Sequence, residues 1–252
     1  MKISEQGLLL IDVGNSALKY CFYADLARDR IISLNHGDYD IETLLNQLKS
    51  MGALRHISLA NVYKAEVEIQ ISDWCKQNNL GFFLARSVTE SLGLFNAYAE
   101  PDKLGVDRWL LMLSAWRYLK KDCFVISCGT ATTFDAIDSQ GRHLGGLIMP
   151  GLATTKEALS VGTEQIECIE SSSSSSLELA NNTAEAVTNA ALVATIGFLQ
   201  KGIEVSGMQT SPGIITGGWA ESLMPYLPDN ISYDKLAVMR GLALQAIGSD
   251  AQ

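Results

Sequence analysis

The sequence predicts an α/β protein with two mixed sheets flanked by helices. An apolar run at residues 8–11 passes through Asp12 and a Gly-Asn-Ser corner into a second apolar run at residues 18–23. This pattern is typical of a strand, a tight turn and a returning strand. The same layout recurs at residues 123–138, where Gly129 stands 115 residues after Gly14. A repeat in each half of the chain predicts two similar domains, 1–119 and 120–252, facing each other across a nucleotide cleft.

Strand and helix patterns alternate after the first hairpin, which favours a mixed sheet with helices on its faces. Apolar residues at helical spacing predict helices, and short apolar runs predict strands. In chain order we expect a strand at 30–34, a helix at 40–51, a strand at 56–60, a helix at 65–78, a strand at 82–84 and a helix from Asp107 to about residue 120.

The second half continues the alternation after its own hairpin. The run Ser171–Ser176 predicts a solvated, mobile loop. The last helix is expected to pack back across both domains. In chain order we expect a strand at 144–152, a helix at 154–159, a helix from 182 towards 199, a strand from 213 that ends in a glycine corner and opens a helix, and a final helix at 233–247.

Composition and net charge limit the classes of protein to which the chain can belong. The net charge is −9, whereas proteins that bind nucleic acid or acidic membranes normally present a basic face, so we expect neither partner. The five cysteines form no C-x-x-C pair, which is typical of a reducing cytoplasm. No apolar run is long enough for a signal peptide or a membrane span. We therefore expect a soluble cytoplasmic protein.

The first glycine corner carries the parts needed to grip nucleotide phosphates. Gly14 lets backbone amides approach an anion, and Asn15 and Ser16 add short donors. Lys19 brings a positive charge, and Asp12 is placed to hold magnesium through water. Short glycine motifs are weak evidence, because an ordinary hairpin with a surface lysine has the same letters.

A second group of reactive side chains lies at residues 96–109, where a loop runs into a helix. Asp107 is predicted near the helix N-terminus, where the dipole favours an ionised carboxylate. It could act as a general base, with Arg108 gripping a substrate carboxylate. The alternative is a capping aspartate with a solvated arginine partner. Thr183 has a similar ambiguity, since it could cap its helix or point a hydroxyl into the cleft.

Five ordered motifs span nearly the whole chain. They are Asp12-Val13-Gly14-Asn15-Ser16 with Lys19, Leu104-Gly105-Val106-Asp107-Arg108-Trp109, Cys128-Gly129-Thr130-Ala131-Thr132-Thr133-Phe134-Asp135, Gly145-Gly146-Leu147-Ile148-Met149-Pro150-Gly151 and Thr216-Gly217-Gly218. This set of motifs resembles type III pantothenate kinases. The resemblance implies the actin, sugar kinase and acetate kinase superfamily, with two ribonuclease H-like domains in an actin-like ATPase fold. It implies ATP-dependent phosphorylation of the 4′-hydroxyl of pantothenate, the first step of coenzyme A synthesis.

The resemblance also implies roles for individual residues, with Asp107 as the catalytic base. It implies a homodimer with pantothenate near the subunit interface, magnesium with ATP, and a monovalent cation such as K⁺ or NH₄⁺. The implied ATP-binding residues are Asp12, Val13, Gly14, Asn15, Ser16, Ala17, Leu18, Lys19 and Thr130, and the implied pantothenate-binding residues are Tyr98, Gly105, Val106, Asp107, Arg108 and Thr183.

One position departs from the family pattern. Ser127 stands where the family usually has an aspartate that helps to hold the monovalent cation, and an uncharged serine oxygen offers a weaker site. Two alternatives therefore stay open beside the pantothenate kinase. One is a kinase of another small hydroxylated metabolite, and the other is a regulatory protein like the Bvg accessory factors that retains the fold. Retention of Asp12, Lys19, Asp107 and Arg108 disfavours the regulatory protein, whereas the serine at position 127 slightly favours it.

Overall fold

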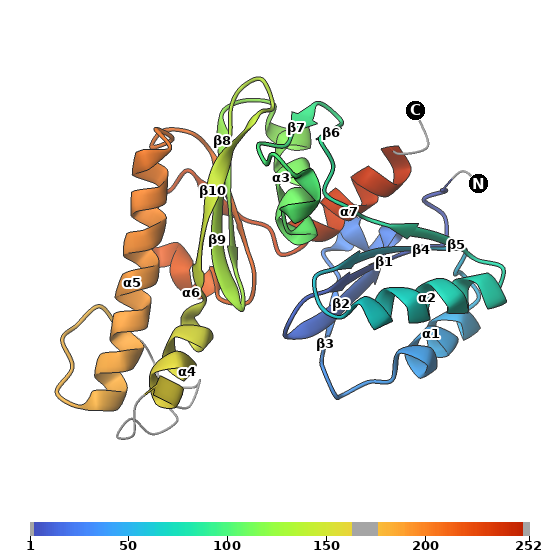
Figure 1. The fold of residues 1–252 in the computed structure, drawn as a ribbon, viewed down its shortest axis with the longest axis horizontal. Coiled ribbons are helices and arrows are strands. Elements are labelled where there is room, and N and C mark those ends of the chain that lie inside the picture. The colour runs from blue at the N-terminus through green and yellow to red at the C-terminus, as the bar shows by residue number, and fades with distance from the viewer. Residues whose placement is uncertain (1–2, 163–175, 249–252) are drawn as a thin grey trace. The chain divides into compact units, whose positions relative to one another are not determined.

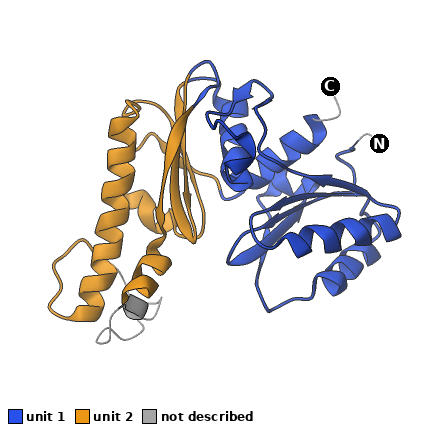
Figure 2. Cartoon of the chain, in the orientation of Figure 1, with its two compact units in different colours: residues 1–121, 139–143, 235–252 blue, residues 122–138, 144–234 orange. Residues whose placement is uncertain are grey.

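The computed structural model describes residues 3–162 and 176–248, which fall into two compact units (Figures 1 and 2). Unit 1 comprises residues 1–121, 139–143 and 235–252, and unit 2 comprises residues 122–138 and 144–234. Most of the serine run predicted as a loop lies outside the described residues, as does Cys168. The side chains of residues 160–162 are also outside the description.

Unit 1 is built on a five-stranded mixed sheet of order β3-β2-β1-β4-β5. The first three strands form an antiparallel meander, and β4 and β5 extend the sheet in parallel from β1. The central strand β1 is almost wholly buried, as expected of a strand covered on both faces. The strands are β1 (Leu8–Val13), β2 (Ala17–Phe22), β3 (Ile32–Asn35), β4 (His56–Asn61) and β5 (Gly81–Leu84).

Helices cover both faces of this sheet (Figure 1). One face packs against α1 (Ile41–Ser50) and α2 (Ala65–Gln77), whose buried apolar residues form one core with β1 and β4. Asp40 caps α1 by accepting a hydrogen bond from the Thr43 amide at 2.8 Å. The other face packs against α3 (Val106–Leu119) and α7 (Ala237–Gly248), which also pack against each other.

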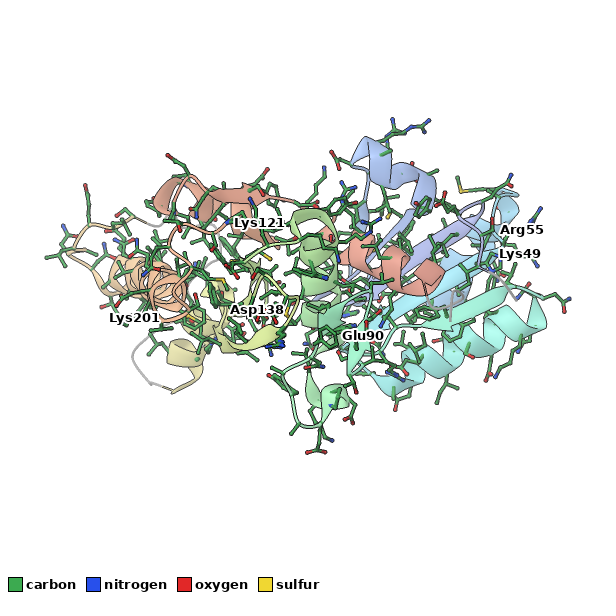
Figure 3. All side chains as sticks on the ribbon, turned by 90° about the horizontal axis from the view of Figure 1, so that it is seen from above. Lys49, Arg55, Glu90, Lys121, Asp138 and Lys201 are labelled. Carbon is green, nitrogen blue, oxygen red and sulfur yellow. The ribbon has the colours of Figure 1, made fainter. Side chains whose placement is uncertain are left out.

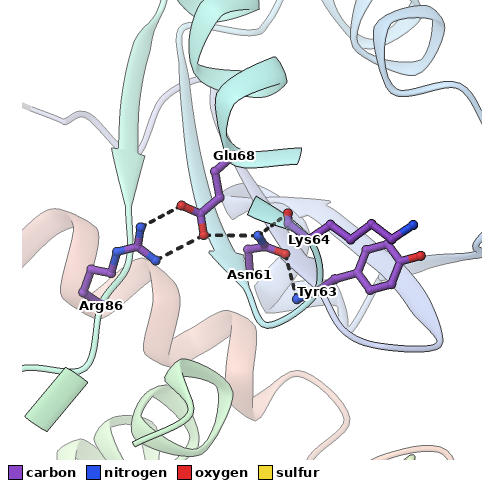
Figure 4. A network of polar contacts seen from close by, with 5 residues as sticks. All are labelled: Asn61, Tyr63, Lys64, Glu68 and Arg86. Carbon is purple, nitrogen blue, oxygen red and sulfur yellow. Dashed lines mark hydrogen bonds and ion pairs between the residues drawn. The ribbon is translucent and has the colours of Figure 1, made fainter. Parts of the chain in front are cut away.

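Two side chains from different elements secure the connection that follows β4 (Figure 4). The Asn61 side chain accepts a hydrogen bond from the Tyr63 amide at 3.0 Å and donates to the Lys64 carbonyl at 3.0 Å. It also donates to Glu68, which forms a two-point ion pair with Arg86 at 3.1 and 2.6 Å. Because Asn61 lies beside Val13 in the sheet, this network fixes the loop next to the end of β1.

Unit 2 repeats the strand arrangement of unit 1. Its sheet has the order β10-β9-β8-β11-β12, with β8 antiparallel to β9 and parallel to β11. Both predicted sheets are therefore confirmed, and the helices of unit 2 share a core with its sheet. The elements are β8 (Cys123–Cys128), β9 (Ala131–Ile137), β10 (His143–Pro150), α4 (Leu152–Gly162), α5 (Thr183–Val205), β11 (Gly213–Thr216), α6 (Ala220–Leu223) and β12 (Ile231–Tyr233).

Contrary to the sequence-based expectation, one described helix, α5, is long and apolar enough to cross a membrane by length and composition alone. Half of its most apolar window is buried in the structure, and a core helix of a soluble protein passes the same test. Leu192, Ile196 and Leu199 of α5 belong to the core of unit 2. Asn182 caps the helix by accepting a hydrogen bond from the Glu185 amide at 2.9 Å.

Several elements differ from the sequence-based expectation. The sequence predicts a final helix at 233–247, but the structure has the strand β12 at Ile231–Tyr233 and begins α7 at Ala237. A strand of three residues has too little alternation to be recognised from sequence. The short hairpin of β6 (Glu90–Ser91) and β7 (Leu94–Phe95) was likewise missed. Elsewhere, α5 continues to Val205, beyond its expected end near 199.

Candidate active site

The first glycine corner joins β1 to β2. The Gly14 amide donates to the Ala17 carbonyl at 3.0 Å, which closes the turn. Val13 and Leu18 are buried on either side of it, whereas Asn15 and Ser16 are exposed. Asp12 and Lys19 are direct partners across the antiparallel pair. Asn15 and Ser16 are therefore exposed to solvent at the turn, and the strands beside them carry the acidic Asp12 and the basic Lys19.

The fold itself does not require a glycine at position 14. Gly14 does not adopt a positive φ, and an added Cβ would meet nothing nearer than the Ala17 carbonyl oxygen at 3.6 Å. That distance is an ordinary van der Waals contact. The space in front of Gly14 is thus open for a ligand to approach the backbone.

His36 braces this corner, a contact that the sequence reasoning missed. Its Nε2 lies 2.8 Å from the Gly14 carbonyl oxygen, and its Nδ1 lies 3.0 Å from the Tyr39 hydroxyl. A carbonyl oxygen can only accept, so Nε2 carries the hydrogen in this bond. The ring stacks on Tyr63 with 4.1 Å between centroids. These contacts join the turn to the β3–α1 loop and to the loop after β4.

Asp12 has an environment that disfavours its charge. Burial raises the pKa of Asp12 from 3.8 to about 6, Lys19 acts to lower it, and the nearby negative charge of Asp107 raises it. Two carboxylates of unit 1 are thus close enough to repel each other. A site of this kind is stabilised by a bound cation.

Asp107 and Arg108 occupy the first turn of α3, as the sequence predicted. Asp107 is the second residue of the helix, and a Cβ on Gly105 would come within 2.7 Å of its Oδ1. The carboxylate therefore lies back against the backbone of Gly105. Its neighbour Val106 is buried and anchors the start of the helix.

Arg108 is a buried cation, with 5% of its surface exposed. Its Nη1 donates to the Tyr98 hydroxyl at 3.0 Å, and its guanidinium carbon lies 5.9 Å from the Tyr98 ring centroid. Tyr98 also stacks on His143, with 6.1 Å between centroids. The segment 139–143 of unit 1, which ends at the first residue of β10, thus contributes to the surroundings of Arg108.

A cavity of about 600 Å³ in unit 1 adjoins this group of side chains. It is bordered by residues next to Tyr98 in the chain and by the β9–β10 connection. Its lining residues are Phe95, Asn96, Ala97, Gln140, Arg142 and His143.

The second glycine corner joins β8 to β9 in unit 2. The Gly129 amide donates to the Ala131 carbonyl at 3.0 Å, and an added Cβ would approach nothing closer than 4.0 Å. The Thr130 carbonyl accepts from the Gly151 amide at 2.9 Å and from the Thr154 hydroxyl at 2.8 Å. The Thr130 side chain is exposed.

In unit 2, packing requires glycine at two positions outside the β8–β9 turn. A Cβ on Gly151 would clash with the Gly129 carbonyl oxygen, and one on Gly217 would clash with the backbone of Cys128. Gly217 also adopts a φ of 103°, which favours glycine. The Trp219 amide, two residues later, donates to the Cys128 carbonyl at 3.2 Å. The motifs that contain Gly151 and Gly217 therefore let neighbouring backbone pack directly against the Gly129 corner.

The remaining predicted site residues lie elsewhere in unit 2. Ser127 is half-buried at the end of β8, where it pairs with Thr133. Thr183 is the exposed first residue of α5 and borders a cavity of about 520 Å³. Within the described ranges, no group of three or more His, Cys, Asp or Glu side chains could hold a metal ion.

The structure thus gathers the predicted residues into two sets, one in each unit. In unit 1, Asp12 lies close to Lys19 and Asp107, and Tyr98 bonds to Arg108. In unit 2, Ser127 and Thr130 share one corner, whereas Thr183 belongs to a different element. The sequence reasoning missed His36 because its contact with Gly14 joins loops 22 residues apart.

Comparison with known proteins agrees with the sequence resemblance. The family model described as "Type III pantothenate kinase" matches residues 8–204. A protein of that name from Nitrosococcus oceani is 33% identical over 250 residues, which cover 94% of this chain and 92% of the relative. Another from Colwellia psychrerythraea is 31% identical and covers 92% of both chains.

Two solved structures support the fold. A putative Baf family transcriptional activator from Campylobacter jejuni has a TM-score of 0.64 at 24% identity, covering 96% of this chain and 98% of that one. The activator of 2-hydroxyisocaproyl-CoA dehydratase from Clostridium difficile, with bound ADPNP, has a TM-score of 0.52 at 13% identity, covering 97% and 96%. At these identities the likeness concerns the fold alone, which is the actin-like ATPase fold.

Proposed function

The chain belongs to the type III pantothenate kinase family, and from this premise we propose that it transfers the γ-phosphoryl group of ATP to the 4′-hydroxyl of pantothenate. It is a kinase, so ATP is its phosphoryl donor. The product, 4′-phosphopantothenate, is the first intermediate on the route to coenzyme A. The observation that carries the proposal is the placement of Asp107 beside Asp12 and next to the Arg108–Tyr98 pair.

Asp107 suits the role of general base. A primary alcohol loses its proton as the new O–P bond forms, and an ionised carboxylate can accept that proton. The first turn of a helix favours the ionised form. Asp107 is half-buried rather than enclosed, so a substrate hydroxyl can reach it.

Arg108 and Tyr98 suit the carboxylate of pantothenate. A buried guanidinium binds a carboxylate strongly, because its donors match the two oxygens and little water competes. The hydrogen bond to Tyr98 fixes the guanidinium before substrate arrives. Fixing one end of pantothenate places the hydroxyl at its other end, and positioning is the main demand of phosphoryl transfer.

Lys19 and the two glycine corners suit the phosphates of ATP. The open backbone at Gly14 and Gly129 offers amide donors, and Lys19 offers a positive charge. Asp12 fits magnesium, because Mg²⁺ is bound by one or two carboxylates together with phosphate oxygens. The ion, when bound, would offset negative charge around Asp12 and the phosphates.

The residues of this chain support a monovalent-cation site less well than a magnesium site. Ser127 offers one uncharged oxygen at the end of β8. We propose that activity depends less on K⁺ or NH₄⁺ than it would with an aspartate at this position. Titration of the purified enzyme with KCl against a large-cation salt would contradict this if activity vanished without K⁺.

A homodimer is part of the proposal. The edge strand β10 exposes three large apolar side chains, Leu144, Leu147 and Ile148, and an exposed apolar edge favours pairing with another chain. The first turn of α5, with Thr183, adds exposed alanines. We further propose that units 1 and 2 correspond to the two ribonuclease H-like domains, and that the enzyme acts in the cytoplasm. A monomer mass in light scattering would contradict the dimer.

The direct test is to incubate the purified protein with MgATP and pantothenate and to look for phosphopantothenate by mass spectrometry. We expect Asp107→Asn to lower kcat by about 10²–10⁴-fold, the usual contribution of a general base. Asp102→Asn is the matched control, because Asp102 is an exposed carboxylate just ahead of α3. Turnover of a different small alcohol, with none of pantothenate, would redirect the substrate assignment.

A further inference from the structure

Lys156 in α4 is a buried lysine that the roles above leave unused. Only 6% of its surface is exposed. Among the described residues, its one charge interaction is with the Trp219 ring, whose centroid lies 5.9 Å from Nζ. Lysine is almost never buried unless it is paired, and attraction to a ring at this distance is small beside the cost of removing an ammonium from water. The fold alone does not account for this buried charge.

The position of Lys156 links it to the second glycine corner. Its helix, α4, begins just after Gly151, and the helix residue Thr154 binds the Thr130 carbonyl through its hydroxyl. Its ring partner Trp219 binds the Cys128 carbonyl through its amide. Lys156 and Trp219 therefore belong to the two segments that hydrogen-bond directly to the corner.

The corner itself supplies no positive charge. Residues 127–133 contain no charged side chain. Burial raises the pKa of the Cys128 thiol to about 12, so that group is neutral at physiological pH. In unit 1, by contrast, Lys19 is part of the hairpin. Any protein side chain that brings positive charge to a phosphate at the corner of unit 2 therefore comes from outside residues 127–133.

We propose that Lys156 binds the phosphates of ATP, donating charge-assisted hydrogen bonds from its ammonium to phosphate oxygens at the Gly129 corner. This role rests on the proposed function, because it takes ATP as the ligand. The anion supplies the partner that the buried ammonium lacks among the described residues. Trp219 holds the lysine in place while the nucleotide is absent.

The experiment compares three variants for binding of MgATP and of adenosine by titration calorimetry. Lys156→Met keeps the length and the apolar stem but removes the charge, and Lys156→Arg keeps the charge. Lys201→Met is the matched control, because Lys201 lies at the surface of α5 in the same unit and pairs with Glu204 at 2.7 Å (Figure 3). Adenosine has the base and ribose of ATP without its phosphates.

We expect Lys156→Met to weaken MgATP binding about tenfold or more, as for the loss of a hydrogen bond between charged groups. Adenosine binding should be unchanged, and Lys156→Arg should retain most of the affinity for MgATP. The apo form of Lys156→Met should melt at the same temperature as the wild type or higher, because an uncompensated buried charge has been removed. Lys201→Met should match the wild type in its affinity for MgATP, its affinity for adenosine and its melting temperature.

Several results would overturn the proposal. Unchanged MgATP affinity in Lys156→Met would do so, as would equal loss of MgATP and adenosine binding. A lower melting temperature of the apo variant with unchanged affinity would make Lys156 a structural residue held by Trp219. A changed oligomeric state with unchanged affinity would assign its partner to another subunit.

The proposed function is tested separately, because these titrations contain no pantothenate. If the wild type binds MgATP but does not phosphorylate pantothenate, the substrate assignment fails and the role of Lys156 stands. If the wild type does not bind MgATP, both fail.

Discussion

The two glycine corners share a framework but differ in how charge reaches them. Both join the first two strands of a five-stranded sheet with the same order, and in both the glycine amide closes the turn at 3.0 Å. The unit 1 corner has Asp12 paired with Lys19 on its own strands, whereas the equivalent positions of unit 2 hold Ser127 paired with Thr133. The same strand order therefore does not imply the same electrostatics.

The neighbours of each corner differ as well. The unit 1 corner is braced by a side chain, since His36 binds the Gly14 carbonyl. The unit 2 corner is braced by backbone and hydroxyl groups, with Gly151 and Thr154 on the Thr130 carbonyl and Trp219 on the Cys128 carbonyl. Backbone and hydroxyl groups therefore hold the second corner, and none of them brings a charge to it.

The largest expected effect tests whether the backbone of each corner takes part in the reaction. Gly14→Ala and Gly129→Ala should each lower kcat/KM at least about 100-fold, because a methyl group blocks close approach of phosphate to the amides. The free energy of unfolding should change little, since each Cβ has room in the free protein. Steady-state kinetics and urea unfolding give the two values.

The matched control for this pair is Gly151→Ala. Its Cβ would clash with the Gly129 carbonyl oxygen, so we expect a loss of stability as well as of activity. If either corner variant keeps full activity, the backbone of that corner does not bind the nucleotide.

The next effect tests the acid that only the first corner carries. The pKa of Asp12 is raised in the folded protein, so the folded form holds its proton more tightly than the unfolded form does. Ionised Asp12 therefore costs stability, a cost absent below pH 3.8 and complete above about pH 6. Asp12→Asn should raise the melting temperature by about 2–4 °C at pH 8 and leave it unchanged at pH 3.5.

Melting curves of wild type and Asp12→Asn across pH 3.5–8 check this expectation. Ser127→Ala is the control at the equivalent place in unit 2, where no ionisable side chain is lost and no pH-dependent difference should arise. An equal gain for Asp12→Asn at all pH values would show that the carboxylate is not the cause.

The smallest effect tests the brace that only the first corner has. His36→Phe keeps the stacking on Tyr63 but loses the hydrogen bond to Gly14, and it should raise the KM for ATP about three- to tenfold. The KM for pantothenate should stay unchanged. His36→Gln can still donate to the carbonyl and should recover part of the loss. Equal changes in both KM values would point to a general weakening of unit 1.

Much of the framework could be predicted from sequence because it is local. The pairing of Asp12 with Lys19 follows from a short turn, and the buried face of α1 follows from the spacing of Ile41, Leu44 and Leu48. The first turn of α3, with Asp107 and Arg108, was likewise predicted. In each case the residues that decide the structure lie within one hairpin or one helix.

What the sequence could not reveal depends on contacts between distant segments. Lys156 meets Trp219 across 63 positions of the chain, and His143 meets Tyr98 across 45. Neither the spacing nor the type of these residues indicates such a contact. The strand β12 escaped notice for a related reason, because its three residues are defined by pairing with β11.

Unit 1 is built from segments that lie far apart in the chain, and this has a consequence for its synthesis on the ribosome. The helix α3, which carries Asp107, packs against α7 so closely that a Cβ on Gly241 would clash with the Leu110 carbonyl. Because α7 follows every predicted site residue in the chain, a nascent chain already long enough to hold them all still lacks the surface that supports α3. We expect such chains to be inactive, and catalytic competence to arrive only after α7 has left the exit tunnel.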